Sequence, residues 1–181
     1  MENIEKLKYP IGRLTIPVEV STSMRQDYIK AINDLPMAIE DLTDNLSDEQ
    51  LDTPYRPGGW TVRQLIHHIA DSHMNAFTRF KLGMTEDEPT IRPYNQAAWC
   101  SMSDATSLDP QLSLDIISGI HGRWVRVLHD MSDEDYNKNV FHPEMDRRLS
   151  LGQLLCQYGW HSNHHLAHIR DVHKRMNWGI D

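Results

Sequence analysis

Cysteines, clustered basic residues and long apolar segments are all scarce in this sequence. The two cysteines, Cys100 and Cys156, form no Cys-x-x-Cys pair, so a zinc ribbon and a dithiol redox motif are excluded, and we expect both thiols to be reduced. The chain has 18 Lys and Arg residues and 26 Asp and Glu residues, and its basic residues are not clustered. This argues against a nucleic-acid partner. No apolar run approaches the roughly 20 residues of a membrane span or resembles a signal peptide. We therefore expect a soluble cytoplasmic protein with no membrane partner.

Four segments carry apolar residues at the three- and four-residue spacing that is typical of helices. The predicted helices cover residues 22–46, 61–84, 110–131 and 150–176, with N-caps at Thr61 and Ser150 and with Pro110 in a first turn. A chain of 181 residues suits one hydrophobic core. The sequence therefore predicts an all-α fold, a four-helix bundle, in a single domain over residues 1–181.

The connections between these helices have their own signatures. Residues 1–20 contain prolines that resist helix, so we expect an extended N-terminal arm. Residues 85–109 are interpreted as a long loop between the second and third helices that borders the functional site. Residues 136–149 are expected to form a short extended excursion. The Ser-Asp-Glu triplets at 47–49 and 132–134 each suit a single capped turn.

Histidine is the residue that the chain has in excess, with 11 copies gathered mainly in the windows 67–73 and 161–168. On the last predicted helix, at about 100° per residue, His165 lies roughly 20° and His161 roughly 60° from the centre of the apolar stripe. His168 lies about 80° and His164 about 120° away. The inward pair is therefore His161 and His165, and two buried imidazoles four residues apart favour a shared metal ion over unpartnered burial.

The second predicted helix offers two candidates for a third ligand. His73 lies within the apolar stripe and His68 lies at its edge, and the pattern alone does not choose between them. His67 faces away and is expected at the surface, where Asp71 could pair with it.

The residue after His161 argues against one familiar class of enzyme. A His-Glu-x-x-His zinc protease needs a glutamate there, and this chain has Ser162. Any base must come from elsewhere, and metal-bound hydroxide is the candidate, because zinc lowers the pKa of its water to about 7. Three imidazole ligands leave an open position, as in catalytic rather than structural zinc sites.

Taken together, seven short segments resemble the YfiT branch of the DinB-like superfamily, over nearly the whole chain. They are YPIG at 9–12, DTPYR at 52–56, GGWTVRQ at 58–64, HHIADSHMN at 67–75, IRPY at 91–94, HGRW at 121–124 and WHS at 160–162. This resemblance implies a four-helix bundle, a homodimer, and one divalent metal per chain. It also implies the metal ligands His68, His161 and His165.

The same resemblance implies a metal-dependent hydrolase that acts on a small-molecule substrate. Two alternatives stay open at this point: a thiol S-transferase of the bacillithiol type, with a low-molecular-weight thiol as substrate, and a non-catalytic bundle with a structural metal. Zinc suits imidazole ligands and an open site, and nickel, manganese and iron are the alternatives. In the long loop, Arg92, Tyr94 and Trp99 are candidates for substrate contact.

Overall fold

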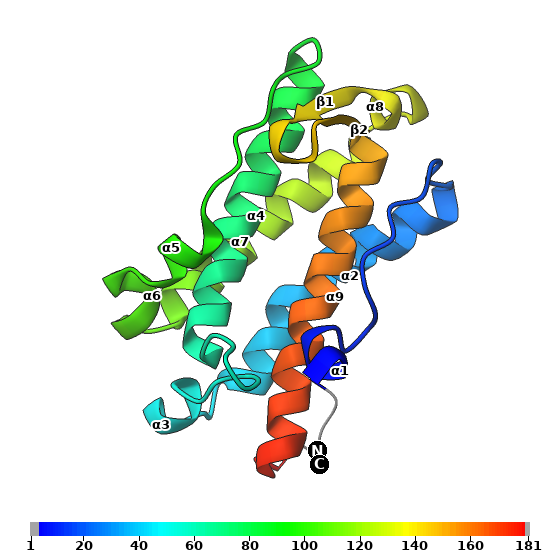
Figure 1. Ribbon diagram of the computed structural model, residues 1–181. Helices are drawn as coiled ribbons and strands as arrows, with labels where there is room; N and C mark the ends of the chain where they lie inside the picture. The colour runs from blue at the N-terminus through cyan, green and yellow to red at the C-terminus, as the bar shows by residue number, and fades with distance from the viewer. Residues whose placement is uncertain (1–3, 180–181) are drawn as a thin grey trace.

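Four long helices run alongside one another in the computed structural model, which describes residues 4–179 (Figure 1). They are α2 (Thr22–Thr43), α4 (Val62–Thr85), α7 (Gln111–Asp130) and α9 (Leu151–Met176). The predicted all-α four-helix bundle is confirmed. Within the described residues, no helix has the length and apolarity needed to cross a bilayer.

The helices begin where the sequence supplies caps. The Thr61 hydroxyl accepts from the Gln64 backbone N–H while the Gln64 side chain accepts from the Thr61 backbone, and Ser150 and Gln153 repeat this capping box at the start of α9. The first long helix ends earlier than predicted, at Thr43 instead of residue 46.

Short elements fill the connections. In chain order they are α1 (Ile4–Lys8), α3 (Asp48–Leu51), α5 (Gln96–Cys100), α6 (Ser103–Ser107), α8 (Asp133–Asn137), β1 (Asn139–His142), a 3-10 turn (Pro143–Met145) and β2 (Arg147–Ser150). Two predictions are corrected here. The arm at 1–20 is not wholly extended, because α1 lies ahead of its first proline, and the loop at 85–109 contains α5 and α6. The two capped turns, α3 and α8, are confirmed.

The predicted extended excursion is an antiparallel hairpin at one end of the bundle, with α3 at the opposite end (Figure 1). Val140 and Leu149 face each other across the hairpin, and both are fully buried. The chain before α5 joins its edge, because Ile91 N–H donates to Phe141 C=O and Phe141 N–H donates to Pro89 C=O, each at 3.0 Å. The hairpin thereby holds the long connection beside α4.

The apolar core consists of two clusters of buried side chains. The first cluster includes side chains from residues 76–80 of α4 and residues 151–158 of α9. The second includes side chains from residues 62–70 of α4 and residues 166–172 of α9. Along these helices, His73, His161, His164 and His165 therefore lie between the two clusters, whereas His68 lies within the stretch of the second cluster.

Helices α2 and α9 pack tightly against each other at Gly159. A Cβ atom at this position would lie 2.6 Å from Cβ of Tyr28, far inside van der Waals contact. Only glycine lets the two helices pack at this distance, two residues before His161.

Candidate metal centre

Imidazoles from α4 and α9 meet at the middle of the bundle. Nε2 of His161 lies 3.3 Å from Nε2 of His68 and 3.1 Å from Nε2 of His165. The three ligand atoms lie within 4.8 Å of one another, with His68 and His165 buried and His161 partly exposed. The structure thus brings together the three histidines predicted as metal ligands.

The spacing of these nitrogens matches what one ion requires. Zinc–nitrogen bonds of roughly 2.0 to 2.1 Å in a tetrahedral site separate the nitrogens by about 3.3 to 3.4 Å. The separations of 3.3 Å and 3.1 Å lie within a few tenths of an ångström of that range. Among the described residues, no fourth His, Cys, Asp or Glu ligand atom joins this group. The group can therefore hold a metal and leave coordination positions open.

Burial keeps these imidazoles neutral, which a metal ligand must be. Burial lowers the pKa of His68 to about 4. The pKa values of His161 and His165 are lowered well below the ordinary range, first by burial and then by the neighbouring imidazoles. At neutral pH each ring therefore keeps a lone pair for an ion.

A chain of hydrogen bonds behind His161 determines which nitrogen carries its proton. The carbonyl of Ile32 only accepts, so Nδ1 of His121 donates to it, and Nε2 of the neutral His121 accepts from Nδ1 of His73 at 2.7 Å. Nε2 of His73 then accepts from Nδ1 of His161 at 3.0 Å. The Nε2 lone pair of His161 is consequently left pointing at His68 and His165.

The position of His73 separates it from the converging group. It meets His161 on the Nδ1 side, opposite the nitrogen that faces His68 and His165. Partners that hold a ligating imidazole in this way set its tautomer and its ring orientation. Of the two candidates on α4, His68 therefore lies within the group and His73 lies behind it.

A second group, His164, His165 and His168, could also hold an ion. Nε2 of His164 lies 3.1 Å from Nε2 of His168, the same separation as between His161 and His165. Burial and then the charge of the nearby Arg56 guanidinium lower the pKa of His164 to about 4. Burial, the His164 imidazole and then Arg56 lower the pKa of His168 to about 3. A fixed positive charge disfavours a second cation here, which makes the first group the better candidate.

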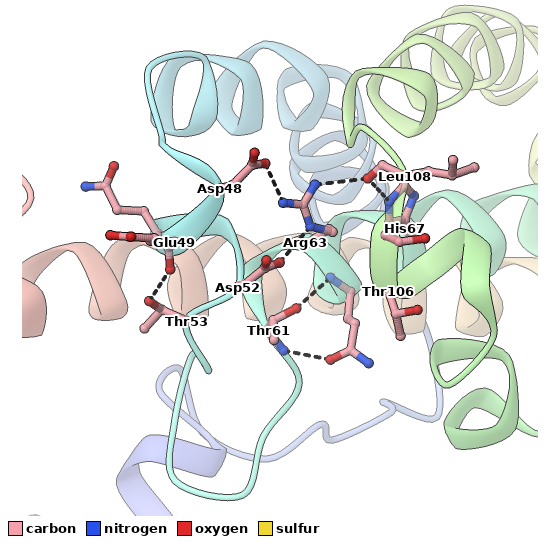
Figure 2. A network of polar contacts seen from close by, with 12 residues as sticks. Asp48, Glu49, Asp52, Thr53, Thr61, Arg63, His67, Thr106 and Leu108 are labelled. Atoms are coloured by element: carbon pink, nitrogen blue, oxygen red, sulfur yellow. Dashed lines mark hydrogen bonds and ion pairs between the residues drawn. The ribbon is translucent and has the colours of Figure 1, made fainter.

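Two histidines are more buried than the apolar stripes predicted. His164, expected to face outward, is buried because the Trp160 ring stacks on it at 4.2 Å and Tyr9 approaches it from the N-terminal segment. The prediction that His67 is a surface residue is wrong. Its Nδ1 lies 2.7 Å from the Ser113 hydroxyl. Its Nε2 lies 3.3 Å from the Leu108 carbonyl (Figure 2). Both helices are covered on more than one face.

Two cavities reach the converging histidines. The first, of about 430 Å³, is lined by all three of them and by aromatic side chains that include Tyr9, Trp60 and Trp160. The second, of about 240 Å³, shares His161 with the first. Among its lining residues are Ser72, Arg79, Tyr94, Gln96, His142, Glu144, Gln157 and Tyr158. Both cavities include His161 and Gln96, so they meet beside the histidine group.

The three residues predicted to contact substrate have different positions. Tyr94 lines the second cavity. Trp99 packs its ring against Tyr94 at 4.5 Å and lines neither cavity. Arg92 contributes its backbone carbonyl, which accepts from Arg79 at 2.7 Å. Sequence reasoning missed Arg79 itself, although a cation next to Phe80 on the buried face of α4 was a signal.

Comparison with known proteins agrees with this architecture. Residues 31–169 match the model of the DinB superfamily. The chain belongs to the DinB superfamily. A DinB-superfamily relative from Bacillus subtilis, named "Putative metal-dependent hydrolase YfiT", is 41% identical over 95% of this chain and 97% of its own length. A Bacillus pumilus relative of the same description is 49% identical over 95% and 98%.

A solved structure gives the same result for the fold. The structure of YfiT from Bacillus subtilis, described as having an unusual four-helix bundle topology, superimposes with a TM-score of 0.93 and 41% identity. The match covers 96% of this chain and 99% of that one.

Proposed function

We propose that this member of the DinB superfamily is a metal-dependent hydrolase of a small molecule, in which His68, His161 and His165 hold one divalent metal per chain. The convergence of three neutral imidazoles from two helices, next to cavities that reach them, is the observation that carries this proposal. The descriptions of the relatives as metal-dependent hydrolases support it. A homodimer in the cytoplasm is part of the same proposal and rests on resemblance.

The donor set favours zinc, with nickel and manganese as the alternatives, because imidazole is a borderline ligand that suits several divalent ions. When bound, such an ion would supply a coordinated water whose pKa is near 7. The chain's own contribution is positional. His161 is oriented by His73 and His121, and the Ser72 hydroxyl lies 3.5 Å from Nε2 of His161, at the edge of the second cavity.

The absence of a further ligand argues against a purely structural metal. A metal that only joined α4 to α9 would be expected to have four protein ligands, and the described residues place three together. A thiol S-transferase would use the same three ligands, so the distinction between transfer and hydrolysis is left to experiment.

Metal analysis tests the ligand assignment. Protein purified without a nickel column should contain about one divalent ion per chain, as expected for a single three-histidine site. His161→Ala and His165→Ala should each lose that ion. The matched control is His129→Ala, which removes an exposed histidine of α7. Full metal retention in both ligand variants would refute the assignment.

Activity assays separate the two reactions. Metal-loaded protein should hydrolyse members of a panel of small esters and amides, and the activity should disappear with a chelator and in His68→Ala. Conjugation of a low-molecular-weight thiol to an electrophile, with no hydrolysis of the panel, would replace hydrolase by thiol transferase.

A further inference from the structure

Arg79 on α4 is a buried cation without a counterion among the described residues. The residue is 7% exposed. Its guanidinium donates to the Tyr158 hydroxyl at 2.6 Å and to the Arg92 carbonyl at 2.7 Å. Both acceptors are neutral, and its Nε–H is buried without any acceptor. Within residues 4–179, no carboxylate forms an ion pair with it. Burying a charged guanidinium without an ion pair lowers the stability of the fold, and a bound anion would offset this cost.

The other buried arginines of the described chain show how this fold compensates such charges. Arg25 pairs with Asp133, and Arg63 pairs with both Asp48 and Asp52. Arg79 is thus the exception among Arg25, Arg63 and Arg79, which are exposed to similar extents of 8%, 5% and 7%.

The cavity beside Arg79 contains further polar atoms that lack partners. Nδ1 of His142 and Oε1 of Gln157 are buried, have no hydrogen bond and belong to residues that line the same 240 Å³ cavity. Burial, and after it the charge of Arg79, lowers the pKa of His142. The one carboxylate in the lining, that of Glu144, belongs to an exposed residue and forms no ion pair with Arg79. The cavity therefore combines a guanidinium that has no ion pair within residues 4–179 with an imidazole nitrogen that can donate and an amide oxygen that can only accept.

We propose that this cavity binds an anionic group of the substrate, a carboxylate or a phosphate, through Arg79. The inference deepens the proposed function and rests on it, because His161 lines the cavity and would place the bound molecule beside the metal. Its volume of about 240 Å³ lies below the range of roughly 300 to 1,000 Å³ for whole ligand pockets. The anionic group occupies this cavity, and the rest of the substrate extends past His161 and Gln96 into the larger one.

A titration on metal-free protein tests the inference independently of the metal. With arginine side chains labelled with nitrogen-15, the Nε–H signal of Arg79 should move saturably on addition of acetate or of inorganic phosphate, and should not respond to acetamide. A stronger response to acetate identifies a carboxylate group, and a stronger response to phosphate identifies a phosphoryl group. No saturable response to either anion would overturn the proposal.

Variants locate the binding on Arg79. Arg79→Gln should weaken anion binding about 10- to 100-fold, the range expected for a lost charge-assisted hydrogen bond, as measured by calorimetry or competition. The control is Arg126→Gln, which removes an exposed arginine paired with Asp130 on α7 and should bind as the wild type does. Equal affinity in Arg79→Gln and wild type would refute the proposal.

A second variant remains informative if Arg79→Gln does not fold. Gln157→Glu puts a carboxylate into the cavity, and it should supply the missing counterion and abolish acetate binding. Unchanged acetate binding in this variant would also overturn the inference. If anions bind only to metal-loaded protein, the role of Arg79 is refuted while the metal-site proposal is unaffected. The two proposals can therefore fail separately.

Discussion

The two buried arginines of α4 have similar exposure and opposite surroundings. Arg63, near the start of the helix, donates to Asp48, Asp52 and the Leu108 carbonyl, and so connects α3, α4 and the chain before α7 (Figure 2). Arg79, four turns later, has two neutral acceptors and, in the part of the chain that the structure describes, no carboxylate partner. Where a buried charge supports the fold, this chain supplies its own counterion. An uncompensated charge beside a cavity indicates a place for a molecule from outside.

Lowering the pH should reduce the stability of the metal-free fold, because its buried imidazoles resist protonation. Burial lowers the pKa of His121 to about 4, whereas an unfolded imidazole titrates near 6.5. Below about pH 6.5 the unfolded chain takes up a proton that the folded chain refuses. The stability of metal-free protein should therefore be complete above that pH and fall towards pH 4, by up to about 3 kcal/mol for this one imidazole.

Urea unfolding of metal-free protein at several pH values would measure this loss. His121→Gln lacks the titrating ring, so its stability should decline less steeply with acid. Stability that stays constant between about pH 7 and pH 5 would contradict the prediction.

Removing the partner behind His161 should loosen the metal without unfolding the chain. His73→Leu deletes the acceptor of the His161 Nδ1–H, and metal affinity should fall about 10- to 100-fold in a chelator competition assay. For comparison, His67→Asn changes a histidine at the Arg63 end of α4, and it should leave metal affinity unchanged. Equal metal affinity in His73→Leu and wild type would remove the orienting role.

The smallest effect should distinguish the two arginines by stability. Arg63→Met should lower the free energy of unfolding by about 1 to 2 kcal/mol, because two ion pairs and a hydrogen bond to a carbonyl are lost. Arg79→Met loses two hydrogen bonds but also removes an uncompensated buried charge, so its net change should be smaller. Denaturant unfolding without carboxylate buffers compares them, and a larger loss in Arg79→Met would reverse our interpretation.

Features decided within one helix could be predicted from the sequence. Thr61 and Ser150 cap helices because their partners lie three residues away, and His161 and His165 share a face because they lie four residues apart. These local rules determined the four helices and the predicted histidine pair.

Features that depend on how helices are rotated against one another could not be predicted. The contact between His73 and His121 joins α4 to α7, and no spacing along the chain encodes it. His67 and His164 were expected to be exposed because a single buried stripe was assumed, but neighbouring segments cover α4 and α9 on additional faces. The free charge of Arg79 likewise becomes visible only once its surroundings are known.

The lack of a side chain at Gly159 determines where α9 places its histidines relative to α4. Because even one methyl group would collide with Tyr28, substitution by alanine would have to push α9 away from α2. His161 and His165 would move with α9, while His68 would stay on α4. The absence of a Cβ atom at residue 159 therefore sets the distances between the three imidazoles.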